Sequence, residues 1–199
     1  MTLAALKTTG IPESPWMHTY SGKAFPFMEP GISDIDIHDI AHALSMQCRF
    51  NGHLRWFYSV AEHSVNVSHE VDETYALAAL LHDATEAYIG DLISPLKVYL
   101  PEFQEIEHRL EHTIRRRFNI ASYDSIQDHE VKRADLAMCV FEGRSLLPNP
   151  NLVDAWGFSH NPLFSTTRKP HTLRGLTPEA AKMSFLKRFD ELMLARTKA

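Results

Sequence analysis

Three polar side chains, His82, Asp83 and Glu86, lie close together in a segment whose leucines and alanines recur at helical spacing. At about 100° per residue on a helix, Glu86 falls angularly between the other two, so all three occupy one narrow arc. An imidazole and a carboxylate at consecutive positions, with a second carboxylate one turn later, can place two ligands and one acid or base around a single cation. The alternative is an exposed polar face with an incidental histidine, and this segment alone does not decide between the two.

Two other predicted helices carry a polar side chain inside the apolar stripe that should face the core. His63 lies on the valine-rich side of the segment that starts at about 58, and Asp135 lies on the apolar side of the segment that starts at about 127. A lone buried histidine is more often a hydrogen-bonded core residue than a ligand. A buried carboxylate, however, is costly unless it is paired with a cation or coordinates a metal. With the His-Asp pair, these positions make a mixed set of nitrogens and carboxylates that suits a divalent transition metal. The candidate ligands are His63, His82, Asp83 and Asp135.

The residues around this set indicate phosphate chemistry. A turn ahead of the first histidine carries Arg49, Phe50 and Arg55. Arginine binds phosphate in a bidentate manner, and an aromatic ring beside it can stack on a base, although solvated surface is the simpler explanation for either arginine in isolation. After the His-Asp segment, a loop supplies a third acidic group, Asp91, and a cation, Lys97. The sequence therefore places cations as well as acids beside the candidate ligands.

These side chains need elements to position them, and the patterning predicts an all-α fold. The chain has 8 Gly and 11 Pro, and most prolines separate long stretches with an apolar period near 3.6. Thr74 is predicted to cap the start of one helix and Gly90 its end, while Thr177 and Pro178 begin another. The expected helices cover residues 34–47, 58–72, 74–89, 101–119, 127–147 and 178–196.

Two segments lack a helical period. Residues 1–31 form an irregular N-terminal segment, in which residues 16–20 and 24–25 can pair as a small hairpin. Residues 148–176 form a long loop, and loops of that length tend to be lids, partner contacts or irregular packing. Aromatic side chains are enriched in interface cores, so those of this loop either fold over the site, pack irregularly on the domain, or pack against a second subunit of a homo-oligomer. The aromatic residues of the loop are Trp156, Phe158 and Phe164.

The composition limits the classes of function. The 199 residues are 44% hydrophobic and 23% charged, which predicts a single globular domain over residues 1–199. The net charge of -5 does not supply the affinity on which a binder of nucleic-acid polymers depends. No apolar run approaches the roughly 20 residues of a membrane span, and two cysteines cannot build a disulfide framework, so we expect a cytoplasmic protein without membrane contact. The 12 histidines stand out, because histidine is the commonest metal ligand.

Three strings resemble those of a known family: residues 58–64 (YSVAEHS), 82–86 (HDATE) and 90–97 (GDLISPLK). A histidine, then a His-Asp pair on a helix, then a distant aspartate resembles the metal-binding signature of the HD-domain phosphohydrolase superfamily. The strings are similar to those of its bacterial 5′-deoxynucleotidase subgroup. Viral deoxynucleoside triphosphate hydrolases of the same build also resemble the chain. The resemblance extends over residues 35–141.

The resemblance implies an HD-domain helical bundle in which the four candidate ligands hold the metal. It also implies that Glu86 and Asp91 take part in water activation or proton transfer and that Arg49 binds phosphate. Related nucleotidases assemble, so the resemblance also favours a homo-oligomer. A tryptophan often follows this arginine in the nucleotidases, and Phe50 departs from that pattern, which leaves sugar and base selectivity open. No Gly-Tyr-Pro triplet follows the signature, which argues against the cyclic-dinucleotide phosphodiesterases. The Glu-Asp pair of guanosine tetraphosphate hydrolases is also missing.

Together these observations predict an enzyme that hydrolyses phosphate from a deoxynucleotide with metal-activated water. Co, Mn, Zn, Fe or Ni suits the cage, with Mg at a second site. Arg49, Arg55 and Lys97 can bind either of two substrates: a monophosphate cleaved to nucleoside and phosphate, which we favour, or a triphosphate cleaved to nucleoside and tripolyphosphate. A non-catalytic nucleotide sensor is the third alternative, and the acidic Glu86 and Asp91 beside the cage argue against it.

Overall fold

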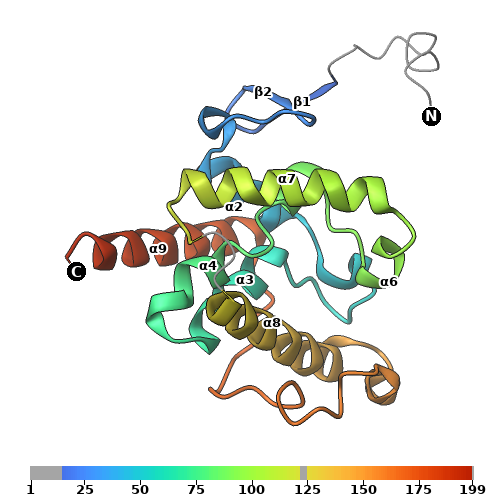
Figure 1. Ribbon diagram of the computed structural model, residues 1–199. Helices are drawn as coiled ribbons and strands as arrows, with labels where there is room; N and C mark the ends of the chain where they lie inside the picture. The colour runs from blue at the N-terminus through green and yellow to red at the C-terminus, as the bar shows by residue number, and fades with distance from the viewer. Residues whose placement is uncertain (1–14, 122–124, 199) are drawn as a thin grey trace.

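The computed structural model of the protein describes residues 15–121 and 125–198, and this part of the chain is mostly helical (Figure 1). The predicted fold class is confirmed, with one small hairpin near the N-terminus. Residues 1–14 of the predicted irregular segment lie outside the described residues. The elements are β1 Trp16–His18, β2 Ala24–Pro26, η1 Ile32–Asp34, α2 Ile37–Met46, η2 Arg49–Gly52, α3 Val60–Glu70, η3 Glu73–Tyr75, α4 Ala76–Leu80, α5 Glu86–Ile89, α6 Ser94–Lys97, α7 Pro101–Arg117, α8 Ser125–Leu146, η4 Pro150–Ala155 and α9 Pro178–Arg196.

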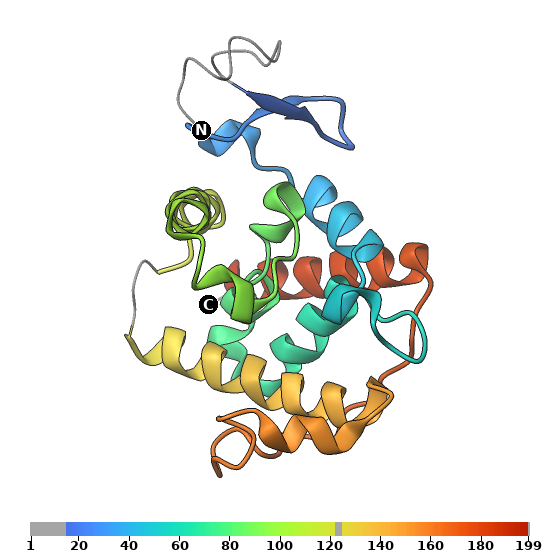
Figure 2. The ribbon, with the colours of Figure 1, turned by 90° about the vertical axis from the view of Figure 1, so that its right-hand side faces the viewer.

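The predicted hairpin is present and lies at one end of the helical body (Figure 2), where Ser21 in its turn hydrogen-bonds to Asp39 of α2. β1 and β2 pair antiparallel, with Met17 opposite Phe25. Gly22 turns the chain between them with a φ of +84°, a conformation that suits glycine. Phe25 is 1% exposed and stacks on Tyr88, and Met17 also packs against the core, so these side chains anchor the hairpin to the helices.

Five helices follow the predicted boundaries, and their caps explain where two of them begin. The side chain of Thr177 accepts a hydrogen bond from the N–H of Ala180 at the start of α9, as predicted. Ser59 does the same for the N–H of Glu62 at the start of α3. The positions of α2, α3, α7, α8 and α9 therefore follow from apolar period and end signals.

The prediction of one continuous helix over residues 74–89 is wrong. The segment divides into η3, α4 and α5, with a tight turn over residues 81–85. Thr74 caps no helix, since Asp72 precedes η3 and Tyr75 precedes α4. In the turn, the N–H of Ala84 bonds to the carbonyl of Leu81 instead of continuing the helical ladder. Consecutive side chains diverge by about 100° on a regular helix, and the turn lets two neighbours point to the same place.

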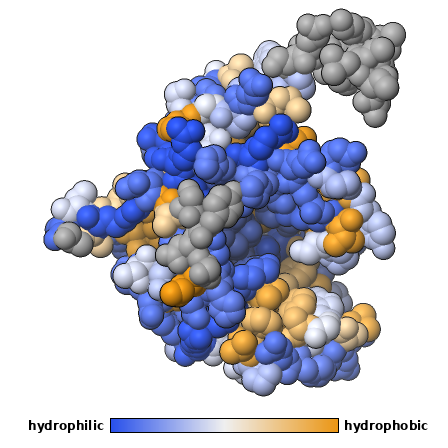
Figure 3. All heavy atoms as spheres, viewed as in Figure 1, coloured by the Kyte–Doolittle hydropathy of each residue, from blue (hydrophilic) through white to orange (hydrophobic). Residues whose placement is uncertain are grey.

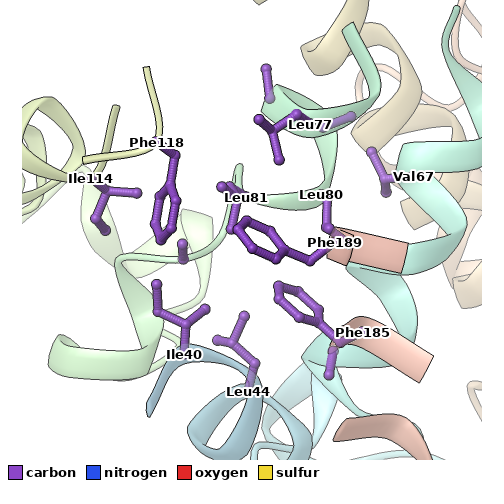
Figure 4. Close-up of a cluster of buried hydrophobic side chains, with 14 of the residues drawn as sticks. Ile40, Leu44, Val67, Leu77, Leu80, Leu81, Ile114, Phe118, Phe185 and Phe189 are labelled. Carbon is purple, nitrogen blue, oxygen red and sulfur yellow. The ribbon is translucent and has the colours of Figure 1, made fainter. Parts of the chain in front are cut away.

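The core lies where α9 packs against α2, α3 and α4. Figure 4 shows Phe185 and Phe189 of α9 between the aliphatic side chains of α2 and those of α4. Phe185, Leu44 and Leu80 are completely buried. This core fixes α3 and the turn after α4, the two elements that carry the histidine pair.

The long segment after α8 packs on its own chain. η4 buries Val153, and the Trp156 ring stacks on that of Phe50 with 6.1 Å between the ring centroids. A Cβ atom at Gly143 would lie 2.7 Å from the Trp156 ring, so the absence of a side chain at this position lets the ring pack against α8. Irregular packing is therefore the alternative that applies to Trp156, while the homo-oligomer stays a prediction.

The face seen in Figure 1 is largely hydrophilic, and hydrophobic side chains gather near α6 and over the segment that follows α8 (Figure 3). Among the described residues, no helix combines the length and the apolar character that crossing a bilayer requires.

Candidate metal centre

Four side chains from three parts of the fold converge on one point. His63 is on α3, His82 and Asp83 are in the turn after α4, and Asp135 is on α8. The Nε2 atoms of the two histidines are 3.3 Å apart. Asp83 Oδ2 lies 3.2 Å from His82 Nε2 and 3.7 Å from His63 Nε2. Asp135 Oδ1 lies 3.4 Å from His63 Nε2 and 3.8 Å from His82 Nε2. The structure thus brings together the complete predicted ligand set.

Both imidazole rings turn Nε2 toward this point because Nδ1 is engaged elsewhere. His82 Nδ1 lies 2.7 Å from the carbonyl oxygen of Ala79, and a carbonyl can only accept, so Nδ1 carries the proton. His63 Nδ1 donates in the same way to Glu142 Oε1 at 2.7 Å. With Nδ1 engaged as a donor in both rings, Nε2 is the nitrogen left to bind a metal ion once it carries no proton.

A divalent cation fits this arrangement. Asp83 Oδ2 is buried and has no hydrogen-bond partner among the described residues, which is costly for a carboxylate unless a cation satisfies it. Ligand atoms of His63, His82 and Asp83 all lie within 4.8 Å of one another, the one such group in the described part of the chain. Two imidazoles and two carboxylates favour a transition metal over Mg²⁺, which prefers oxygen ligands.

The charges of the cluster agree with this assignment. Burial raises the pKa of Asp83, but His82 and His63 outweigh it and hold the pKa well below its usual range. Burial also raises the pKa of Asp135, and the hydrogen bond from His63 together with the charge of Lys132 more than reverses this effect. Both carboxylates are therefore ionised near neutral pH and supply the two negative charges that a divalent ion needs.

The protonation of His63 depends on the same neighbours. Burial and the charge of Arg49 lower its pKa, but Glu142 and Asp135 outweigh them and raise it to about 9. An ion that binds at Nε2 must therefore displace a proton.

Glu142 supports the cluster from behind, and the sequence analysis missed it. Its side chain is fully buried, accepts a hydrogen bond from the Tyr58 hydroxyl at 2.9 Å and holds His63 Nδ1. A carboxylate behind a histidine fixes the ring and raises its basicity toward a metal. The signal was present, because Glu142 follows Asp135 by seven residues and so lies on the same face of α8.

Substitution of Glu142 tests this supporting role. We expect Glu142→Gln to weaken metal binding by about 10- to 100-fold, because the amide keeps the shape but loses the charge that orients and polarises His63. The measurement is competition with a chromophoric chelator. Tyr58→Phe is the matched control, since it removes one donor to Glu142 and leaves the charge in place. Equal metal affinity in Glu142→Gln and in the unmodified protein would show that Glu142 only packs.

Arg49 lies against the same cluster, in the turn η2. Its Nη1 is 3.7 Å from Asp83 Oδ2, its Nη2 is 3.4 Å from Glu142 Oε2, and its buried Nε has no partner among the described residues. Phe50 adopts a φ of +53°, which is strained for a bulky residue, and its ring stacks on Trp156. The half-buried ring of Phe50 therefore packs against Trp156, while the guanidinium of Arg49 keeps Nε as a donor for an anion.

Glu86 and Asp91 lie beside the cluster, at α5 and just after it. Glu86 is 6% exposed, and its Oε2 is unpartnered within the described residues. Burial and the charges of Asp83 and Asp91 raise the pKa of Glu86 well above its usual range. Burial is also the main cause that raises the pKa of Asp91. Lys97 Nζ lies 4.0 Å from Glu86 Oε1 and 2.6 Å from Glu107 Oε1.

A cavity of about 360 Å³ opens onto three of the four candidate ligands, His82, Asp83 and Asp135. Each of the other charged residues that line it forms an ion pair: Lys97 with Glu107, Lys132 with the candidate ligand Asp135, and Arg115 with both Glu111 and Asp128.

Arg55 is not placed with this group. Its Nη2 donates to the carbonyl of Pro148 at 3.3 Å, and its backbone N–H donates to the carbonyl of Leu146. Arg55 is exposed, and these contacts attach the turn after η2 to the end of α8. The structure therefore gives Arg55 a structural contact and does not bring it to the cluster.

Comparison with known proteins identifies relatives. No protein-family model matches the chain. The chain is 43% identical over 131 residues to the uncharacterized protein YfdR of Escherichia coli strain K12, which covers 66% of this chain and 72% of YfdR. It is 37% identical over 115 residues to an uncharacterized protein of Rhodobacter capsulatus, which covers 53% of this chain and 59% of that protein. Identity at this level over more than two thirds of YfdR shows common descent, and the chain therefore belongs to the family of YfdR-like proteins.

Proposed function

We propose that the protein is a metal-dependent phosphohydrolase that removes phosphate from a deoxynucleotide. The observation that carries the proposal is the convergence of two imidazole Nε2 atoms and two ionised carboxylates on one point. The buried Nε of Arg49, without a partner in the described part of the chain, lies in a side chain that contacts this point and suits a phosphate oxygen. The resemblance of the three sequence strings to HD-domain phosphohydrolases supports the same chemistry.

Each part of the site has one role in this proposal. The four candidate ligands hold a divalent ion, which when bound supplies a Lewis acid and a water of lowered pKa. Arg49 binds and orients the phosphate. Glu86, whose pKa is raised by burial and by neighbouring carboxylates, gives its proton to the oxygen that leaves with the nucleoside. Asp91 takes the proton of the attacking water, and Lys97 offsets charge beside Glu86.

The charges of the cavity favour a monophosphate over a triphosphate. The lining cations Lys97, Lys132 and Arg115 are each engaged by at least one carboxylate, as described above. A triphosphate would need several free cations or a second metal ion to hold its additional oxygens. Arg49 with one metal ion is enough for a single phosphate group. The preferred reaction is therefore the cleavage of a deoxynucleoside monophosphate to deoxynucleoside and phosphate.

One experiment separates the three candidate functions. Protein loaded with Mn²⁺, Co²⁺ or Zn²⁺ is incubated with a panel of deoxynucleoside monophosphates and triphosphates, and inorganic phosphate is separated from tripolyphosphate. We expect phosphate from the monophosphates. Tripolyphosphate would identify a triphosphohydrolase. Binding of nucleotides without any turnover would identify a sensor.

Glu86→Gln tests the assignment of the proton donor. We expect turnover to fall by about 10²- to 10⁴-fold, because the amide cannot deliver a proton, while the metal content stays that of the unmodified protein. Elemental analysis and phosphate release measure the two quantities. Glu105→Gln, the same substitution at an exposed position of α7, should change neither. Loss of metal in Glu86→Gln would instead make Glu86 a ligand.

A further inference from the structure

Gln47, the residue that follows α2, has the one side chain in the described residues that hydrogen-bonds to both Glu86 and Asp91. Its Nε2 donates to the carbonyl oxygen of Glu86 at 2.9 Å. Its Oε1 accepts from the backbone N–H of Asp91 at 3.0 Å. The amide therefore bridges the first and last residues of the stretch that holds both candidate proton-transfer groups.

Residues 86–91 need a hydrogen-bond partner from elsewhere in the fold, because α5 ends before Asp91. α5 is four residues long and ends at Ile89, and Gly90 then turns the chain with a φ of +82°. The N–H of Gly90 bonds to the Glu86 carbonyl, but Asp91 lies beyond that turn and its N–H reaches no helical carbonyl. Gln47 supplies an acceptor for the N–H of Asp91 and a second donor for the carbonyl of Glu86, as the peptide group of a neighbouring strand would in a sheet.

The backbone around Gln47 is fixed to the metal side of the site. The carbonyl of Gln47 accepts the N–H of Val60, the first residue of α3, and the N–H of Arg49 donates to the carbonyl of Tyr58. Residues 47–49 thus pair with the segment that leads into His63. The main chain of Gln47 bonds to the start of α3, the helix that carries His63, and its side chain bonds to the stretch that carries Glu86 and Asp91. Gln47 therefore sets the spacing between these two parts of the site.

We propose that Gln47 is a positioning residue for Glu86 and Asp91, acting on their main chain and touching neither the metal point nor the substrate. The inference rests on the proposed phosphohydrolase function and adds to it the residue that fixes its proton-transfer geometry. A displacement of about 1 Å at a catalytic group can reduce turnover by about 10²-fold. Loss of Gln47 should therefore lower kcat and leave the metal and the substrate-binding groups in place.

The test uses two variants that keep the length of the side chain. Gln47→Met removes both hydrogen bonds, and we expect kcat on deoxynucleoside monophosphates to fall by about 10- to 100-fold with KM and metal content unchanged. Gln47→Glu can accept from Asp91 when ionised, but it can donate to Glu86 only when protonated. The ratio of its kcat to that of the unmodified protein should therefore rise as the pH falls from about 7 to about 5, while the ratio for Gln47→Met stays constant.

The control is Ser45→Ala, which removes the hydrogen bond from Ser45 Oγ to the His42 carbonyl in the same helix and should leave kcat unchanged. A normal kcat in Gln47→Met, or a pH-independent ratio for Gln47→Glu, would overturn the inference and leave the proposed function intact. Absence of turnover in the unmodified protein would overturn the proposed function itself, and the inference with it. The two failures are therefore distinguishable.

Discussion

Protein in which Asp83 is replaced by alanine is expected to lose its metal ion and, with it, all measurable hydrolysis. Asp83 Oδ2 faces both histidine Nε2 atoms, at 3.2 and 3.7 Å, lies 3.7 Å from Arg49 Nη1, and has no hydrogen-bond partner in the described part of the chain. Its charge is one of the two that neutralise a divalent ion. Replacement of a residue that only supports a ligand costs about 10- to 100-fold in metal affinity, so removal of a ligand should cost more.

The measurement is metal content by elemental analysis after dialysis, followed by phosphate release. Asp154→Ala is the control, because Asp154 forms an exposed ion pair with Arg144 away from the cluster and should keep both metal and activity. Asp135→Ala should behave as Asp83→Ala does, since Asp135 Oδ1 faces the same two nitrogens. A full equivalent of metal in either ligand variant would contradict the four-ligand cage.

The sequence predicts the helices and the candidate ligands because both depend on the regular spacing of apolar residues. Apolar residues at a period of 3.6 mark α7, α8 and α9, whose observed ends lie within two residues of the predicted ones. His63 and Asp135 could be found because each is a polar residue inside an apolar stripe. Burial of such a side chain is costly unless it has a partner. Glu142 is a polar residue on the same buried face of α8, so the sequence carries the same signal for it.

Other features could not be found in this way because they depend on tertiary contacts. The break after α4 replaces local helical bonds by a turn that lets His82 and Asp83 meet His63, and periodicity cannot show where such a partner lies. The role of Gln47 depends on two main-chain atoms of a segment 39 and 44 residues away. Arg55 is of a type that suits a phosphate, but it bonds to the carbonyl of Pro148 just after α8. Residue type alone therefore does not predict where a side chain lies.

The second large effect concerns the stability of the fold. It involves Glu70 at the end of α3 and the donors that surround its carboxylate, on Arg133 and on residues 168–171, a cluster that we call the Glu70 clasp. Glu70 has a fully buried side chain and accepts from Arg133 Nη1 at 3.1 Å, while Arg133 itself is 1% exposed. Three further donors reach the Glu70 carboxylate: the backbone N–H groups of Arg168 and Lys169 and the ring of His171. The clasp ties α8 and residues 168–171 to the helix that carries His63.

Glu70→Ala should therefore lower the free energy of unfolding by about 3–5 kcal/mol, because it removes the acceptor of the buried Arg133 Nη1 and of three further donors. Urea denaturation measures the loss. Glu130→Ala is the matched control, since Glu130 contacts the same arginine from a position that is 25% exposed, and it should cost less than about 1 kcal/mol. A similar small cost for Glu70→Ala would mean that the clasp adds little to stability.

The same clasp predicts a pH dependence. Burial raises the pKa of Glu70, but the hydrogen bonds from His171, Arg168, Arg133 and Lys169 outweigh it and lower the pKa from 4.5 to about 2. Because the folded pKa lies below the unfolded one, the stabilisation is complete above about pH 4.5 and is lost as the pH falls through about 2. The difference in unfolding free energy between the unmodified protein and Glu70→Ala should therefore shrink as the pH is lowered over this interval. A difference that stays constant would show that the clasp acts through its packing and not through the charge of Glu70.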